Sequence, residues 1–470
     1  MRGATEEGLL RRRFAEAGQE HVFDAEAVLD AAGRARLHAQ LATIDLGLVA
    51  TFRELLRSPV PDPFAGARFE PADVFPLRRS PAQEAEARQA RQRGRELLRA
   101  GRVGCVVVAG GQASRLGFDA PKGCFPVTPL SRASLFELFA RKLQAARARH
   151  GVALSWYVMT SEATDGPTRE AFARADWFGL DREDVCFFRQ AMVPALDAHG
   201  RILMAAPDAP FLAPNGHGGL LAALESSGAL AHARARGIEL FSYFQVDNPL
   251  ARPADELFLG LHALHGARMS SKVVQKRDAA EKVGVLGRVD GRLSCIEYSD
   301  LPERLREARD ARGALLFGAG NIALHVIDRA FVEDLTRGGL HLAWHVASKR
   351  IPVVDAQGAR REVDGFKFEA FVFDALAEAG DSVVLEVERA EEFSPVKNRD
   401  GEDSPASARR DQCRLHAGWA ARAGCALPPA GADGIHPVEV DPRFAEDADE
   451  FAARMPCAPR AVAGGHLYAP

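Results

Sequence analysis

Paired cysteines, long apolar runs and the common phosphate-binding glycine motifs are all missing from this 470-residue chain. The seven cysteines are widely spaced and no two form a CxxC pair, which argues for free thiols in a reducing compartment. No apolar run is long enough to span a membrane, and the N-terminal MRGATEEGLLRRRF is charged where a secretory leader would be apolar. We therefore expect a cytoplasmic protein that contacts no membrane.

A strong charge of either sign is also missing. Lysine and arginine together number 60 and aspartate and glutamate 64, so the formal net charge is only -4. This balance gives no indication of a nucleic-acid partner. With 47% hydrophobic and 26% charged residues, the chain has the composition of an ordinary globular protein, and its length exceeds what one hydrophobic core usually supports.

The pattern of apolar residues changes twice along the chain and predicts three parts. Residues 1–95 have helical spacing and form a helical N-terminal region, interrupted by a proline-rich extended connector over 60–76. Residues 96–385 alternate strand-like and helical runs, which predicts a central α/β nucleotide-binding domain with a mixed, mostly parallel sheet covered on both faces. Residues 386–470 read as a small α+β C-terminal domain.

Local signals place several elements inside this frame. Ser80, Pro81 and Gln83 fit an N-cap, an N1 proline and a capping-box partner, and predict a helix that ends near residue 100. Ser134 and Glu137 suggest a second capping box, on a helix that closes at Gly151. Strands are expected over residues 103–110, 154–161, 240–247, 270–276 and 283–291.

The segment CVVVAGGQASRLGFDAPKGCFPV, residues 105–127, runs from a buried-looking strand into paired glycines. It contains neither GxGxxG nor GxxxxGK[ST], which excludes the usual dinucleotide fingerprint and the Walker A loop. Gly110 and Gly111 would let the backbone approach an anion or a nucleobase, and Arg115 and Lys122 add positive charge. Taken alone, the segment also fits an ordinary tight turn.

Further polar segments follow at the ends of predicted strands. VDNPL places the carboxylate of Asp247 where a divalent cation could face phosphates, and the glycine-rich APNGHGG offers backbone donors around Gly216 and His217 before a helix. EYSDLP, GAGNIALH, GFKFE and FSPVKN supply polar side chains for sugar hydroxyls and two more lysines. Each segment alone could equally be a turn, a core histidine or a solvated lysine.

The order of these segments carries more information than any one of them. From about residue 25 to 425 the series AGGQASRLGFDAPKGCFPV, PNGHGG, VDNPL, EYSD, GAGNI, GFKFE and EEFSPVKN resembles the eukaryotic-type UDP-sugar pyrophosphorylases. The likeness is greatest to the UDP-N-acetylglucosamine pyrophosphorylases. The resemblance implies a glycosyltransferase-A-like fold and a uridylyl transfer from UTP to a sugar 1-phosphate, with UDP-sugar and pyrophosphate as products.

Site roles follow from this resemblance, position by position. Asp247 would bind Mg²⁺, with Mn²⁺ as the alternative, and Arg115, Lys122 and Lys397 would be the catalytic cations. The residues implied to bind UTP are Ala109, Gly110, Gly111, Lys122, Gln190, Gly216, Asp247, Lys367 and Lys397. The residues implied to face the sugar are His217, Asn248, Glu297, Tyr298 and Asn321.

The chain departs from the family pattern at three places. GGQASRLG has Ala113 and Ser114 where the family usually has glycine and threonine, so Ala113 would be strained by about 1 kcal/mol if its φ were positive. His217 replaces the asparagine typical of the N-acetylglucosamine enzymes, and VDNPL has Pro249 where an aliphatic residue is common. N-acetylglucosamine 1-phosphate is the expected sugar, with glucose 1-phosphate or a broad range of sugars as the alternative.

Two other functions remain open from the sequence. A relative that keeps the fold but has lost catalysis is disfavoured because Arg115, Lys122, Asp247 and Lys397 are all present. A dinucleotide-dependent oxidoreductase is disfavoured by the missing GxGxxG. The chain also offers no Ser/His/Asp or Cys/His nucleophile motif, which suits a reaction in which the substrate phosphate is itself the nucleophile.

Overall fold

The computed structural model describes residues 6–58, 66–354 and 358–470. These residues form two compact units, each assembled from separate stretches of the chain. Unit 1 comprises residues 1–67, 190–219 and 341–372, and unit 2 comprises residues 68–189, 220–340 and 373–470. The three sequential parts expected from the sequence pattern divide the chain at other positions than these two units, and they stay a prediction.

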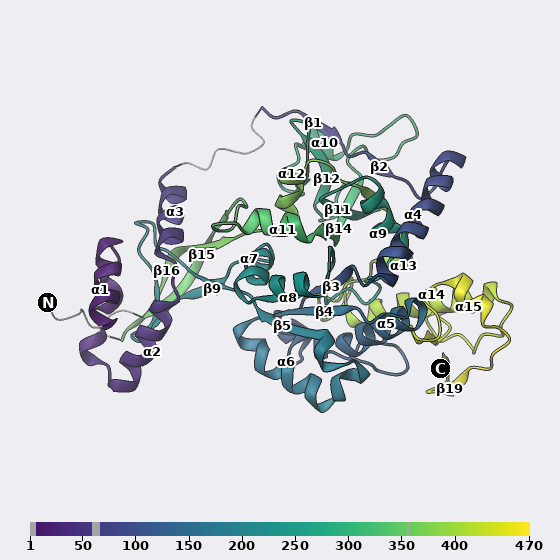
Figure 1. The fold of residues 1–470 in the computed structure, drawn as a ribbon, viewed down its shortest axis with the longest axis horizontal. Coiled ribbons are helices and arrows are strands. Elements are labelled where there is room, and N and C mark those ends of the chain that lie inside the picture. Colours follow the sequence, from purple (N-terminus) through teal and green to yellow (C-terminus); the bar gives the residue numbers. More distant parts are fainter. Residues whose placement is uncertain (1–5, 59–65, 355–357) are drawn as a thin grey trace. The chain divides into compact units, whose positions relative to one another are not determined.

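An eleven-stranded sheet is the centre of unit 2 (Figure 1). Its main path runs β2 (Val74–Phe75), β17 (Val384–Glu386), β11 (Met269–Gln275), β14 (Ala319–Asp328), β10 (Leu240–Gln245), β3 (Val103–Val108), β4 (Ser155–Thr160) and β5 (Val185–Arg189). Strands β1 (Phe69–Pro71), β12 (Val285–Val289) and β13 (Arg292–Ile296) extend it beside β14. The expected α/β class and strand positions are confirmed.

Along the main path the strands are parallel except at β14, which is antiparallel to both β10 and β11. The pairings of β1, β12 and β13 beside this path are antiparallel. Strands β10, β3 and β4 lie in register, with Gln245 opposite Val108 and Val108 opposite Met159. Because the carboxyl ends of parallel strands meet at one edge of a sheet, the segments that follow Val108 and Gln245 start side by side. The expected polar loops are therefore brought to this edge.

Unit 2 also contains several helices before its C-terminal part. They are α4 (Pro81–Arg99), α5 (Leu135–His150), α6 (Glu162–Arg174), α8 (Ala229–Ala235), α9 (Glu256–Leu264), α10 (Glu303–Arg306), α11 (Arg329–Thr336), α12 (Leu376–Ala379) and α13 (Arg389–Glu392). The capping box of Ser80 and Gln83 is confirmed on α4. On α5, Ser134 accepts from the backbone N–H of Glu137 and Gly151 closes the helix with φ 75°, but the Glu137 carboxylate contacts Arg141 instead of completing the box.

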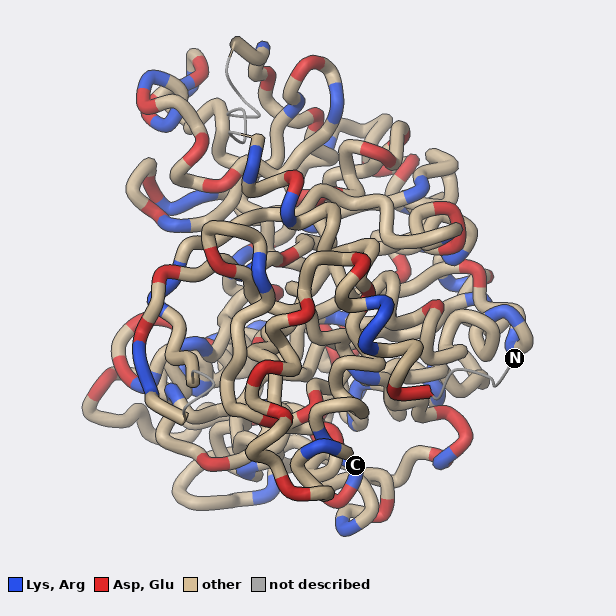
Figure 2. The backbone as a smooth tube through the Cα atoms, turned by 90° about the vertical axis from the view of Figure 1, so that its left-hand side faces the viewer, with Lys and Arg blue, Asp and Glu red and all other residues tan. Residues whose placement is uncertain are grey.

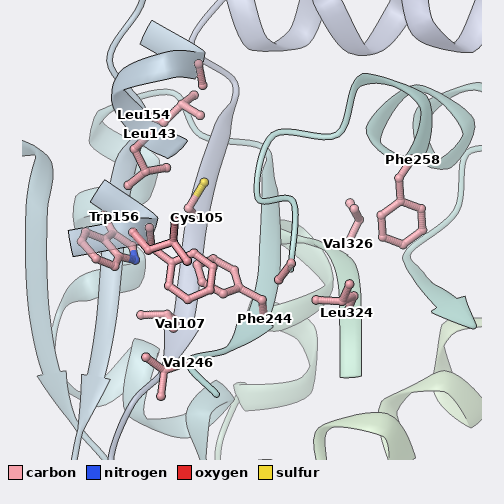
Figure 3. Close-up of a cluster of buried hydrophobic side chains, with 14 of the residues drawn as sticks. Cys105, Val107, Leu143, Leu154, Trp156, Phe244, Val246, Phe258, Leu324 and Val326 are labelled. Atoms are coloured by element: carbon pink, nitrogen blue, oxygen red, sulfur yellow. The ribbon is translucent and has the colours of Figure 1, made fainter. Parts of the chain in front are cut away.

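The core of unit 2 is formed where β3, β4 and β10 meet these helices. Figure 3 shows Cys105 and Val107 of β3 beside Trp156 of β4 and Phe244 of β10. All four side chains are buried, as expected for strands covered on both faces. This packed layer gives the loops at the strand ends a rigid base.

The C-terminal part of unit 2 consists of α14 (Pro405–Arg422), α15 (Ala448–Ala453) and a small sheet of β18 (Val438–Val440), β19 (Arg460–Val462) and β20 (Gly465–Tyr468). Its own apolar cluster includes Trp419, Phe451 and Tyr468. The carboxylate of Glu439 accepts hydrogen bonds from the backbone of Leu130 and Ser131, which ties this part to the segment before α5.

Unit 1 combines N-terminal helices with short strands and one long hairpin. Its elements are α1 (Glu6–Glu16), α2 (Ala31–Ala42), α3 (Leu46–Arg57), β6 (Met192–Pro194), β7 (Met204–Ala206), β8 (Ala209–Pro210), β9 (Leu212–Pro214), β15 (His345–Val354) and β16 (Arg360–Glu369). Phe52 of α3 stacks on Phe368 of β16 with ring centroids 3.9 Å apart. Helix α7 (Gly219–Ser226) begins where unit 1 ends.

The distribution of charge, the hydrophobicity of the helices and the proline-rich connector can each be compared with the sequence expectation. Basic and acidic residues are interspersed along the backbone in Figure 2, and no described helix is both long and apolar enough to cross a membrane. Of the connector expected over 60–76, residues 60–65 lie outside the described residues, and the remainder contains the short strands β1 and β2.

Candidate active site

The first glycine loop leaves β3 and closes on itself. The backbone N–H of Lys122 donates to the carbonyl of Gly111 at 3.0 Å, and the N–H of Ala113 donates to Ala120 at 3.0 Å. The hydroxyl of Ser161, which follows the neighbouring strand β4, donates to the carbonyl of Gly110 at 2.8 Å. The loop is thus fixed by its own backbone and by the next strand end, as a preorganised binding loop requires.

The alanine in this loop is not strained. Ala113 has φ -95° and its side chain is buried. The backbone here is not left-handed, so alanine fits where the family usually has glycine. Gly123 is the glycine that the loop needs, because a Cβ there would lie 2.1 Å from the ring of Phe136. This close approach holds the turn that carries Lys122 against α5.

Lys122 and Asp247 meet at the edge of the sheet. The Nζ atom of Lys122 lies 3.7 Å from Oδ2 of Asp247 and donates to the carbonyl of Val396 at 3.3 Å. The backbone N–H of Val396 donates to the carbonyl of Asp247 at 2.8 Å. Segment 392–397 therefore joins the glycine loop to the loop that carries Asp247.

Lys397 follows directly on this segment. Its backbone N–H donates to the carbonyl of Asp403, and Asn398 donates to the same oxygen at 2.9 Å. The Nζ atom of Lys397 lies 5.9 Å from the ring centroid of Phe393. Burial raises the pKa of Asp403 above its usual range, partly offset by Lys397. The structure thus brings Lys122, Asp247 and Lys397 together through one backbone segment.

The side chain of Asn248 makes its hydrogen bonds within the protein. Its side chain is only 3% exposed. Its Nδ2 donates to the carbonyl of Glu392 at 2.7 Å, and its Oδ1 accepts from the N–H groups of Ser394 at 3.1 Å and Leu250 at 3.3 Å. The amide holds two loops together, so the geometry gives no support to the predicted sugar contact.

Of the residues expected to face the sugar, Asn321 lies on β14, and Glu297 and Tyr298 follow β13; both strands pair with β12. Asn321 of β14 donates from its backbone N–H to the carbonyl of Gly284 at 2.8 Å, and a Cβ on Gly284 would lie 3.3 Å from Oε1 of Glu297. The Oδ1 of Asn321 accepts from the N–H of Ala323, whose φ is 54° within an irregular stretch of β14. Tyr298 is 42% exposed next to Glu297. Glu297 and Asn321 are therefore brought together, as expected.

The second glycine segment, which contains Gly216, lies in unit 1 and packs closely against the backbone of Ala370. Gly216 has φ 79° and a Cβ there would lie 2.3 Å from the carbonyl oxygen of Ala370. The amide of Gln190 donates to the carbonyl of Gly216 at 2.7 Å, which brings together the two residues expected to read the uracil. The N–H of Gly218 donates to the carbonyl of Ala370 at 2.8 Å, so this one backbone donor of the segment is already used within the protein.

His217 is held in one tautomer. Its Nδ1 accepts from the backbone N–H of Val372 at 3.1 Å, and its ring stacks on Phe371 with centroids 5.2 Å apart. Burial, followed by repulsion from His345, lowers the pKa of His217 to about 4. A neutral ring whose Nδ1 accepts carries its proton on Nε2, so near neutral pH His217 is a hydrogen-bond donor through Nε2.

Two further cations are expected at the site. Arg115 is exposed on the single turn Ser114–Leu116, and Lys367 of β16 lies with its Nζ atom 5.2 Å from the ring centroid of Phe211. Lys367 and Gln190 belong to unit 1, whereas the glycine loop, Asp247 and Lys397 belong to unit 2.

The residues at the end of β10 fit a magnesium ion. Mg²⁺ is typically bound by one or two carboxylates, with waters and substrate phosphates completing its coordination. Asp247 supplies a carboxylate whose side chain is 13% exposed. Among the described residues, three potential ligands converge only at Glu7, Glu26 and His38, and there Arg11 contacts both carboxylates.

Several contacts of the site had no signal in the sequence. Ser161, Val396 and Asp403 all contribute through hydrogen bonds that the folded chain creates between distant segments. Val396 makes these hydrogen bonds through its backbone, which no motif of side chains can reveal.

A comparison with protein families connects this geometry to a known group. The family model described as UTP–glucose-1-phosphate uridylyltransferase matches residues 66–415. The chain belongs to this family. It is therefore an enzyme of the UTP:sugar-1-phosphate uridylyltransferase class with UDP-sugar pyrophosphorylase activity.

Individual relatives in the UTP–glucose-1-phosphate uridylyltransferase family are similar over most of the chain. Human UDP-N-acetylhexosamine pyrophosphorylase-like protein 1 is 37% identical over 436 residues, which cover 88% of this chain and 85% of that protein. The Saccharomyces cerevisiae UDP-N-acetylglucosamine pyrophosphorylase is 36% identical over 349 residues, 70% of this chain and 72% of the yeast protein. The crystal structure of the Trypanosoma brucei uridine diphosphate N-acetylglucosamine pyrophosphorylase in complex with inhibitor has a TM-score of 0.83 at 27% identity, covering 100% of this chain and 99% of that one.

Proposed function

We propose that the protein forms UDP-N-acetylglucosamine and pyrophosphate from UTP and N-acetylglucosamine 1-phosphate. The names of the yeast, Dictyostelium and Arabidopsis relatives support this choice of sugar at 35–37% identity. Glucose 1-phosphate, or a broad range of sugar 1-phosphates, is the alternative, because His217 departs from the asparagine expected of the N-acetylglucosamine enzymes.

The observation that carries the proposal is the junction of Lys122, Asp247 and segment 392–397 beside the first glycine loop. A lysine and a carboxylate 3.7 Å apart at the carboxyl end of parallel strands suit a polyphosphate with its divalent cation. In this proposal Ala109, Gly110 and Gly111 contact the uridine, and Arg115, Lys122 and Lys397 contact the phosphates.

The remaining assignments follow the same proposal. Gln190 and Gly216 read the uracil, and Lys367 contributes a phosphate contact. His217, Glu297, Tyr298 and Asn321 face the sugar. Asn248 acts by holding the Asp247 loop against segment 392–394 rather than by touching the sugar.

The proposed reaction is an in-line displacement. An oxygen of the sugar 1-phosphate attacks the α-phosphorus of UTP, the new P–O bond forms, and the bond to the β-phosphate oxygen breaks as pyrophosphate leaves. Lys122 and Lys397 offset the repulsion between two polyanions and hold them in position, so no protein nucleophile is needed. Magnesium bound at Asp247 would supply further positive charge to the phosphate oxygens.

Sugar preference is the most informative measurement. A panel of sugar 1-phosphates, each assayed with UTP and coupled to pyrophosphatase, gives kcat/KM for every sugar. We expect N-acetylglucosamine 1-phosphate to rank first and His217→Asn to change the ranking, because it replaces an Nε2–H donor by an amide of different reach.

The controls separate the sugar from the reaction. A first rank for glucose 1-phosphate would reject the proposed sugar while leaving the reaction class intact. An unchanged ranking in His217→Asn would remove His217 from sugar selection. Activity with NAD-linked substrates but none with UTP would reject the whole proposal.

A further inference from the structure

The loop over residues 246–252 carries Asp247 and is held by two different segments of the chain. It leaves the end of β10, and Pro249 within it has no N–H. Asn248 and Val396 bond its first half to segment 392–396. Its second half presents the carbonyl groups of Pro249 and Ala251 to a different element, helix α5.

Lys142 of α5 donates hydrogen bonds to both of these carbonyls. Its Nζ atom donates to Pro249 at 2.7 Å and to Ala251 at 2.6 Å. The side chain is partly buried and lines a cavity of about 50 Å³, shared with Arg252, Glu391, His416 and Glu446. One ammonium group thus replaces the water that two loop carbonyls would otherwise need.

The charges around Lys142 suit a geometric role. Burial lowers the pKa of Lys142 to about 8. The positive charges of Arg252 and Lys272 also lower this pKa, and the carboxylates of Glu446 and Glu392 raise it. A neutral amine keeps two N–H groups, so both hydrogen bonds to the loop can form in either protonation state. The side chain therefore holds the loop by its donors rather than by its charge.

We propose that Lys142 is a positioning residue, which holds the Pro249 and Ala251 carbonyls so that Asp247 is presented to the metal and to Lys122. The proposal rests on the metal role proposed for Asp247. Lys142 itself touches neither Asp247 nor the glycine loop among the contacts described, so its effect passes through the backbone of residues 249–251.

The test compares Lys142→Met, which has no donor, with Lys142→Arg, which keeps several. Groups that orient a metal ligand typically change metal affinity or activity about 10- to 100-fold, so we expect Lys142→Met to raise the half-saturating Mg²⁺ concentration by that factor. Lys142→Arg should recover most of the loss, and the KM for the sugar 1-phosphate should change little. Arg147→Met on the exposed side of α5, where Arg147 pairs with Asp181, is the matched control.

Amide hydrogen exchange gives a readout that needs neither metal nor substrate. In Lys142→Met, exchange should become faster at Leu250 and Ala251, whose N–H groups bond to Asn248, and remain unchanged in β3 and β4. General destabilisation would instead raise exchange throughout unit 2. If Lys142→Met does not fold, Lys142→Gln, which keeps a single amide donor group, is measured in the same way.

The outcomes distinguish this inference from the proposed function. An unchanged Mg²⁺ requirement in a folded, active Lys142→Met protein overturns the inference, whether or not exchange in the loop increases. If the wild type is inactive with UTP and every sugar tested, the proposed function fails. Exchange alone then decides whether Lys142 holds the loop, and unchanged exchange would reject that as well.

Discussion

Replacing Lys122 by methionine removes the ammonium nearest to Asp247 and keeps the length of the side chain. Its Nζ atom lies 3.7 Å from Oδ2 of Asp247, and the two side chains are 19% and 13% exposed. At this separation and an effective dielectric constant of about 20, two unit charges interact by about 4 kcal/mol. If Lys122 meets a phosphate oxygen in the transition state at a similar distance, its loss lowers kcat by about 10²- to 10³-fold.

The assay is pyrophosphate release from UTP and N-acetylglucosamine 1-phosphate at saturating Mg²⁺. Lys349→Met, the same change at an exposed position of β15, is the control and should retain wild-type kcat. In the double variant with Asp247→Asn, the losses should be less than additive, because both residues act on one cluster of phosphates and metal. A kcat for Lys122→Met within about threefold of wild type would refute the reasoning.

Three further predictions use single features of unit 2. Asp247→Asn should lose activity that a Mg²⁺ titration restores only partly, and an unchanged titration curve would remove Asp247 from the metal site. Gly123→Ala should lower the free energy of unfolding by about 1–3 kcal/mol, since its Cβ would lie 2.1 Å from the Phe136 ring, whereas Gly111→Ala, with open space around it, should not. Burial lowers the pKa of His416 to about 3. The unfolded chain binds a proton near pH 6.5 that the folded chain resists, so stability should fall as pH falls from about 6.5 towards 3. Urea unfolding at several pH values should show a shallower fall for His416→Gln.

Much of the fold of unit 2 could be predicted because its signals are local. The runs at 103–108, 155–160 and 240–245 are mostly apolar strands, and Ser80 and Ser134 mark helix starts by their own hydrogen bonds. The antiparallel direction of β14 could not be predicted, since strand direction depends on how the chain returns to the sheet and leaves no trace in side-chain alternation.

The candidate site was predictable where a residue type itself indicates chemistry. Lys122, Asp247 and Lys397 are charged residues within motifs that could be recognised in the sequence, and segment 392–397 connects them through its backbone. The hydrogen bonds of Asn248 to segment 392–394 could not be predicted, because a buried amide that bridges two loops has the same sequence appearance as one that faces a ligand. The close contacts at Gly123 and Gly216 could be recognised only in the structure, because the sequence does not show which neighbouring atom would clash with a Cβ.

Unit 1 is assembled from stretches that are far apart in the chain, which affects the order in which it can fold during synthesis. Helices α1, α2 and α3 are made first, yet their apolar cluster includes Leu196, Ile202 and Phe368, which come much later in the chain. Phe52 cannot stack on Phe368 until β16 has left the ribosome. The apolar face of the first helices therefore has no complete partner until β16 has been translated, which happens after much of unit 2.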